Sequence, residues 1–235
     1  MLLDKSKELT PAEKAWQTHL LLLQLYGDLP LEPRREPMHE LISTMLSHRT
    51  THANEEAAYF SMMGAFGNWE GVLAAPFEAL ADTLTAAKFP GAKAANIQKA
   101  LARIRERSPD FSLDFLGDLP EAEAMAWLQG LPGVGIKTAR LLLLFNFQKP
   151  VLPVDTHVHR VSQRVGILKA TDTADKAHQL LPQMLPRDAQ VLFNFHKHLY
   201  WHGQRICTWK GPRCEKCPLR EICNYYQEVR KKGVD

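Results

Sequence analysis

The stretch LPGVGIKTA at 131–139 is the segment of this 235-residue chain that decides its fold. Gly130, just before it, is placed to end one helix, and the apolar run that begins at Ile136 starts the next. Gly133 and Gly135 allow backbone angles and close approaches that other residues resist. The pattern therefore predicts two helices joined by a tight, glycine-rich hairpin.

A hairpin of this kind can hold an anion, because its backbone N–H groups and the positive end of the following helix point the same way. A lone G-x-G is often no more than a tight turn between packed helices. The full string is typical of a helix–hairpin–helix, which holds a DNA phosphate without reading the sequence. The residues that we expect to contact DNA here are Gly133, Val134, Gly135 and Thr138.

Outward from the hairpin, the rest of the chain also has helical signals. Thr10 and Glu13 form a capping box around Pro11 at the first helical position, and no stretch alternates with period two. We therefore expect an all-α protein. The expected helices run from Pro11 to near Gly27, through 41–46, from Thr51 to Phe66, onward from Pro76, and over 92–107, 120–128, 136–147, 155–165 and 188–202.

The four cysteines of the chain are gathered near its end, at Cys207, Cys214, Cys217 and Cys223, in the spacing C-x6-C-x2-C-x5-C. Four thiolates so close in sequence can surround one metal centre, either zinc or an iron–sulfur cluster. A disulfide pair is disfavoured, because the start of the chain lacks a secretory signal. Zinc ribbons usually carry two C-x2-C pairs, and only one is present, which favours a [4Fe–4S] cluster without excluding zinc.

Positive charge is concentrated around the same cysteines. The segment 205–220 has five basic residues and one acidic residue, a net +4, whereas the whole chain is only +3. Such a cluster is typical of a phosphate-binding surface, although an isolated charge run is often a solvated tail. We expect Lys210 and Arg213 to contact DNA.

A third motif, VDTHVHR, follows at 154–160. Asp155 stands where a helix begins, so its simplest role is an N-cap. Capping a helix and acting as a functional carboxylate do not exclude each other.

The three motifs, in this order and spacing, resemble those of the endonuclease III family of DNA base-excision glycosylases. The resemblance extends more weakly over about 37–97. It implies an all-α helix–hairpin–helix glycosylase fold with two helical domains and a DNA-binding groove between them. The implied domains are a six-helix barrel at 30–149 and an iron–sulfur domain made of 1–29 and 150–235. By this resemblance the four cysteines ligate a [4Fe–4S] cluster.

The resemblance also implies the chemistry. Lys137 would attack C1′ of a flipped damaged nucleotide, displace the base, and form a Schiff base that permits β-elimination of the 3′ phosphate. Attack needs a neutral amine, and a free lysine has a pKa of about 10.4. The helix start lowers that value by less than one unit, so desolvation by DNA has to supply more. Asp155 favours the ammonium, so it is better cast as a stabiliser of positive charge at C1′ or as a proton acceptor.

Base flipping leaves a gap in the stack that the protein has to fill. By the same resemblance Phe89 is a candidate wedge, with ordinary core packing as its alternative. LSHRTT at 46–51 departs from the family's L-S-A-Q-A-T, so Arg49 replaces the glutamine expected opposite the lesion. Gln129 stands where the family often has a glutamate. These departures bear on substrate range and rate more than on the reaction class.

The function that we expect is a bifunctional base-excision-repair glycosylase and abasic-site lyase acting on oxidised pyrimidines in double-stranded DNA. The alternatives are a monofunctional thymine or uracil mismatch glycosylase, and a non-catalytic iron–sulfur DNA-binding protein. The expected partner is DNA with damaged bases or abasic sites. We expect a monomer without membrane contact, cytoplasmic, nucleoid-associated if bacterial, and not secreted.

Overall fold

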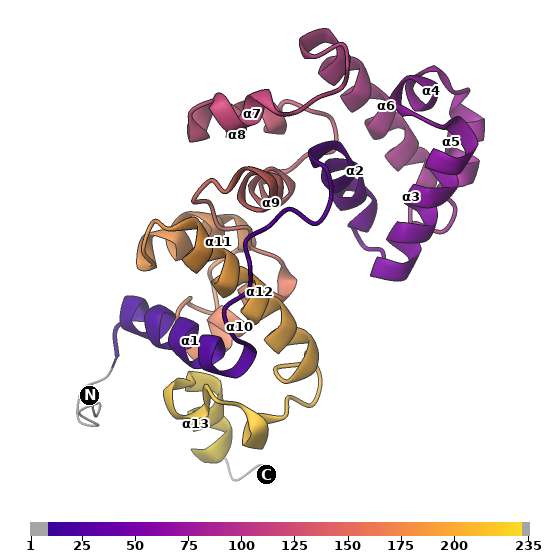
Figure 1. Cartoon of the computed structure of the whole chain (residues 1–235). Coiled ribbons are helices and arrows are strands. Elements are labelled where there is room, and N and C mark those ends of the chain that lie inside the picture. The colour runs from indigo at the N-terminus through magenta and orange to yellow at the C-terminus, as the bar shows by residue number, and fades with distance from the viewer. Residues whose placement is uncertain (1–8, 232–235) are drawn as a thin grey trace. The chain divides into compact units, whose positions relative to one another are not determined.

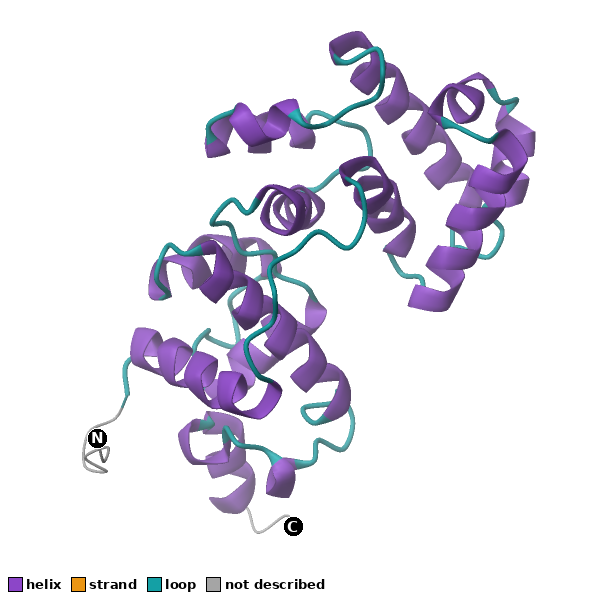
Figure 2. Ribbon diagram, viewed as in Figure 1, coloured by secondary structure: helices purple, strands orange, loops and turns teal. Residues whose placement is uncertain are grey.

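The computed structural model describes residues 9–231, and all regular structure in that range is helical (Figures 1 and 2). The elements are α1 (Pro11–Tyr26), α2 (Pro37–Ser47), α3 (His52–Phe66), α4 (Trp69–Ala74), α5 (Phe77–Thr83), α6 (Pro90–Arg107), α7 (Phe115–Asp118), α8 (Glu121–Gln129), α9 (Ile136–Phe147), α10 (Thr156–Val165), α11 (Ala174–Leu180), η1 (Leu181–Met184), α12 (Ala189–Arg205), η2 (Cys214–Lys216), η3 (Arg220–Ile222) and α13 (Asn224–Lys231).

The prediction of an all-α protein is confirmed. Thr10 and Glu13 form the expected capping box of α1, Thr51 caps α3, and α9 has the bounds predicted from the apolar run. The sequence analysis missed α4, α7, α11 and α13, which are short. The charged start of the chain, at 1–8, lies outside the described residues.

The chain divides into two compact units. Unit 2 is the continuous segment Glu32–Lys149, and unit 1 combines Met1–Leu31 with Pro150–Asp235. Within the described range, no helix is both long and apolar enough to cross a bilayer.

Unit 2 is built around α2, α6 and α9. α2 packs against α3, α6 and α9, and the whole run from Leu41 to Leu46 is buried. The run Leu141–Leu144 in α9 is buried as well, as expected of a helix that is apolar on most faces. Each fully buried leucine contributes roughly 1.5–3 kcal/mol. This core fixes the ends of α2 and α9, which carry two of the predicted site segments.

Unit 1 is built around α12, which packs against α1 and α10. Phe195 on α12 and Leu22 on α1 are fully buried. The same core contains His198 and His202, neither of which is exposed. Burial lowers the pKa of both imidazoles to about 4, because a charged ring would lose its hydration there.

The buried His198 predicts an acid-sensitive unit 1. Its pKa is about 4 in the fold and 6.5 ordinarily, so between these values the unfolded chain takes up a proton and the folded chain does not. The free energy of unfolding is therefore expected to be at its full value above the ordinary pKa and to fall as pH drops toward 4. Urea unfolding across this range, with His198→Gln beside the native chain, measures the effect.

The glutamine variant is expected to give a flatter pH profile, because its side chain cannot take up the proton. His202 keeps part of the slope in both proteins. An identical slope in the two proteins would contradict the assignment to His198.

Candidate functional site

The glycine-rich hairpin lies between α8 and α9, as predicted. Gly133 has φ +81°, in the left-handed region, and a Cβ there would stand 3.0 Å from the side chain of Asn96. Glycine is therefore required at this position both by conformation and by packing. Val134 is buried and donates its N–H to the Leu131 carbonyl at 3.1 Å, so Val134 anchors the hairpin.

Gly135 corrects part of the sequence analysis. Its φ is −92°, which any residue can adopt, and a Cβ at this position would meet nothing within 4 Å. The fold itself therefore does not need a glycine here. What the missing side chain does leave is an exposed backbone that another molecule can approach closely.

Lys137 and Thr138 lie in the first turn of α9, both half-buried. Gly135, the N-cap, has no side chain with which to cap this helix. The positive end of the α9 dipole is thus met by no capping side chain, in contrast to α1, α3 and α12. Lys137 belongs to unit 2.

Asp155 belongs to unit 1 and is the N-cap of α10. Its Oδ1 accepts the N–H groups of His157 and Val158, each at 2.8 Å. The predicted capping role is confirmed. The cap uses one carboxylate oxygen and leaves Oδ2 outside it, so the side chain can serve a second purpose.

Two arginines of α10 connect the Asp155 helix to the cysteine loop. The buried Arg160 donates to the carbonyls of Gly203 at 2.7 Å and Cys207 at 2.9 Å. Arg164 donates to the Thr208 carbonyl at 2.7 Å and approaches Cys207 Sγ at 3.4 Å. The sequence analysis assigned no role to either arginine, although Arg160 closes the VDTHVHR motif.

The four cysteines line one pocket, together with Arg164, Arg213 and Arg220. The pocket has about 290 Å³ of space not filled by protein atoms, open solvent included. A pocket shared by all four cysteines, with the Arg164 guanidinium 3.4 Å from Cys207 Sγ, suits a thiolate-bound centre of negative charge. Among the described residues, no three His, Cys, Asp or Glu side chains are grouped to hold a single metal ion.

Burial makes the thiols of Cys214, Cys217 and Cys223 reluctant to ionise in the protein alone. It raises the pKa of Cys217 to about 12, and it raises the pKa of Cys214 and Cys223 above the ordinary thiol value. Metal ligation needs thiolates, so binding of a metal centre has to displace these protons. The pocket is therefore suited to ligation and poorly suited to a free reactive thiolate.

Lys210 and Arg213 are exposed on the cysteine loop, as a phosphate-contacting role requires. The loop under them is held by its own backbone: Arg213 N–H donates to the Ile206 carbonyl at 2.9 Å, and Thr208 Oγ1 donates to the Lys210 carbonyl at 3.0 Å. Trp209, which directly precedes Lys210, is 72% exposed.

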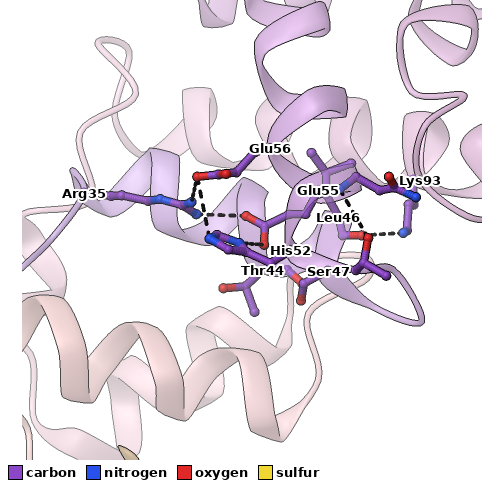
Figure 3. Close-up of polar contacts among 10 residues, drawn as sticks. Arg35, Thr44, Leu46, Ser47, His52, Glu55, Glu56 and Lys93 are labelled. Carbon is purple, nitrogen blue, oxygen red and sulfur yellow. Dashed lines mark hydrogen bonds and ion pairs between the residues drawn. The ribbon is translucent and has the colours of Figure 1, made fainter. Parts of the chain in front are cut away.

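Arg49 and Phe89 lie in two loops of unit 2, and both have left-handed backbones, with φ 54° and 60°. Arg49 is exposed. Phe89 is 53% exposed, so core packing, the alternative for this side chain, is wrong. A polar cluster in unit 2 includes Lys93 and the ion pair between Arg35 and Glu55, which is 2.8 Å long (Figure 3). Neither Lys93 nor Glu55 was singled out from sequence.

Comparison with known proteins agrees with the three motifs. Residues 42–187 match the model of the HhH-GPD superfamily of base excision DNA repair proteins. The chain is 34% identical to endonuclease III of Thermotoga maritima over 84% of this chain and 87% of that protein. It is 31% identical to endonuclease III of Bacillus subtilis, over 84% and 85% of the two chains.

A solved structure shows the same fold. It is a trapped endonuclease III–DNA covalent intermediate, with a TM-score of 0.79 and 25% identity over 94% of this chain and 99% of that one. The family match and the near full-length relatives settle the classification: this chain belongs to the endonuclease III family of helix–hairpin–helix base-excision DNA glycosylases and abasic-site lyases.

Proposed function

We propose that this enzyme removes oxidised pyrimidines from double-stranded DNA and cleaves the strand at the resulting abasic site, with Lys137 as its nucleophile. The observation that carries the proposal is Lys137 in the first turn of α9, directly after the glycine hairpin. A relative of the same fold forms a covalent intermediate with DNA, as a lysine nucleophile would. A monomer that acts in the cytoplasm stays a prediction.

The neutral Lys137 amine attacks C1′, the bond from C1′ to the base breaks, and the base leaves with that electron pair and takes up a proton. The attached amine loses a proton, the C1′–O4′ bond of the sugar ring breaks, and O4′ takes up a proton, so that a C1′ iminium forms on the opened sugar. Loss of a proton from C2′ then breaks the C3′–O bond and releases the 3′ phosphate. Asp155 stabilises the positive charge at C1′ through the carboxylate oxygen that the α10 cap leaves over.

The hairpin holds a phosphate near the reacting nucleotide. Gly135 is exposed with open space beside its α-carbon, Gly133 sets the turn, and Thr138 lies in the following helical turn. Backbone N–H groups at a helix start are a ready anion site. Lys210 and Arg213 add phosphate contacts from unit 1, and such contacts carry no sequence information.

The cysteine pocket holds a [4Fe–4S] cluster, ligated by Cys207, Cys214, Cys217 and Cys223. Support comes from the pocket that the four cysteines share and from the C-x6-C-x2-C-x5-C spacing. When bound, the cluster supplies a rigid cross-link of the loop. The protein's own part is to fix that loop against α10 through Arg160 and Arg164.

Borohydride trapping tests the nucleophile. The native enzyme is expected to give a covalent adduct on duplexes with thymine glycol, dihydrouracil or an abasic site, because borohydride reduces the Schiff base to a stable amine. Lys137→Ala is expected to abolish the adduct, and Lys99→Ala, an exposed lysine of α6, is expected to keep it.

Asp155→Asn is the companion variant, because an asparagine oxygen still caps α10 while the negative charge is lost. Base release is expected to slow while the fold is kept. For the native enzyme, base release without any covalent adduct would favour the monofunctional mismatch glycosylase. DNA binding by the native enzyme without base release or strand cleavage would favour the non-catalytic protein.

Iron analysis tests the cluster. The purified chain is expected to contain iron and acid-labile sulfide, and Cys214→Ser and Cys217→Ser are each expected to lower both, because a ligand is lost. Thr208→Ser, a matched change in the same loop that keeps the hydroxyl, is expected to retain them. Zinc in place of iron and sulfide would contradict the assignment.

A salt series tests the basic loop. Lys210→Gln and Arg213→Gln are each expected to reduce the slope of log affinity against log salt concentration by about 0.9, the effect of one phosphate contact on duplex DNA. Preference for damaged over intact duplex is expected to change little. Lys99→Gln is the control, because it removes the same single positive charge. Salt slopes of the two loop variants identical to that of Lys99→Gln would contradict the assignment of Lys210 and Arg213 as phosphate contacts.

A further inference from the structure

Lys93 is a lysine whose ammonium is turned inward. The residue is only 7% exposed although it stands in the first turn of α6. Its Nζ donates to Thr50 Oγ1 at 2.9 Å, to the His48 carbonyl at 3.1 Å, and to the Leu46 carbonyl (Figure 3). An ammonium has three N–H donors, so all of them are used by the last turn of α2 and the loop after it.

The Thr50 hydroxyl connects the Lys93 ammonium to a second loop. Besides the bond from Lys93, it accepts the backbone N–H of Lys88 at 3.2 Å. Its own O–H donates to the His48 carbonyl at 3.2 Å. One hydroxyl therefore joins the loop at 48–51 to the loop at 84–89. In the L-S-A-Q-A-T pattern of many family members an alanine stands at this position, and alanine has no hydroxyl for such a junction.

Each joined loop contains one residue with a strained backbone. Arg49 lies between His48 and Thr50, and Phe89 follows Lys88 directly; both have φ in the left-handed region. Such a conformation is unfavourable for residues other than glycine and persists where the surroundings enforce it. The bonds from Lys93 and to Thr50 are located where they can enforce it. Both side chains are presented outward, with Phe89 53% exposed.

We propose that Lys93 and Thr50 are positioning residues that clasp the two loops together, so that Arg49 and Phe89 enter the DNA stack as one preorganised pair. This inference rests on the proposed function, in which the two side chains fill the gap left by a flipped nucleotide. A pair fixed in advance loses less conformational freedom on binding than two independent loops. The clasp thereby favours the flipped state in duplex DNA without touching the reacting atoms.

The test compares Thr50→Val, which removes the hydroxyl at nearly constant size, with Thr50→Ser, which keeps it. The first substrate is a duplex with a non-cleavable tetrahydrofuran abasic analogue and 2-aminopurine in the neighbouring stack, whose fluorescence rises on unstacking. The second is abasic-site cleavage under single-turnover conditions, in duplex and in single-stranded DNA. Single strands have no stack for the pair to fill.

Thr50→Val is expected to lower the duplex cleavage rate roughly tenfold, the scale set by loss of hydrogen bonds to a charged donor. The fluorescence amplitude is expected to fall with it. Single-strand cleavage is expected to stay at the native rate, because Lys137 is untouched. Thr50→Ser is expected to keep both the duplex cleavage rate and the fluorescence amplitude at the native level. A general loss of stability would not be reversed by keeping the hydroxyl. Lys93→Met, if folded by circular dichroism, is expected to resemble Thr50→Val.

Equal loss on single-stranded and duplex substrates would overturn the clasp, since it would indicate a general defect. Native behaviour of Thr50→Val on both substrates would overturn it too. Failure of the proposed function has a different signature: the native enzyme would then cleave neither abasic substrate. The fluorescence comparison needs no cleavage, so it would still decide whether Thr50 controls unstacking.

Discussion

Basic side chains bonded to the carbonyls at helix ends are the interaction on which this structure depends. The last carbonyls of a helix have no partner within it and carry the negative end of its dipole. Here Lys93 covers the end of α2, Arg103 that of α8, Lys14 that of α10, and Arg160 that of α12. Hydrogen bonds to a charged donor contribute roughly 1.5–3 kcal/mol each.

The same contacts fix three of the segments to which function is assigned by the proposal. The loop with Arg49 follows α2, the glycine hairpin follows α8, and the cysteine loop follows α12. Each of these three segments therefore begins at a helix end that is closed by a cation from a distant part of the sequence. Irregular backbone can then hold a defined shape without regular secondary structure of its own.

Sequence reasoning predicted the features that depend on neighbouring residues. The capping box of Thr10, the cap by Asp155 and the bounds of α9 follow from local patterns. It did not find Lys93 or Arg160, because their partners are backbone carbonyls over forty residues away. Every residue has a backbone carbonyl, so no residue type marks such a partner in the sequence. Sequence reasoning also overrated Gly135, whose ordinary φ only a backbone could reveal.

The two helix starts that bear the proposed catalytic residues are electrostatically opposite. α10 is capped by the carboxylate of Asp155, which neutralises the positive end of its dipole. α9 is preceded by Gly135, which offers no side chain. An incoming phosphate is therefore drawn to α9 and opposed at α10. Under the proposed function, this contrast favours a strand phosphate at the start of the helix that carries Lys137, and it leaves the Asp155 carboxylate for positive charge on the sugar.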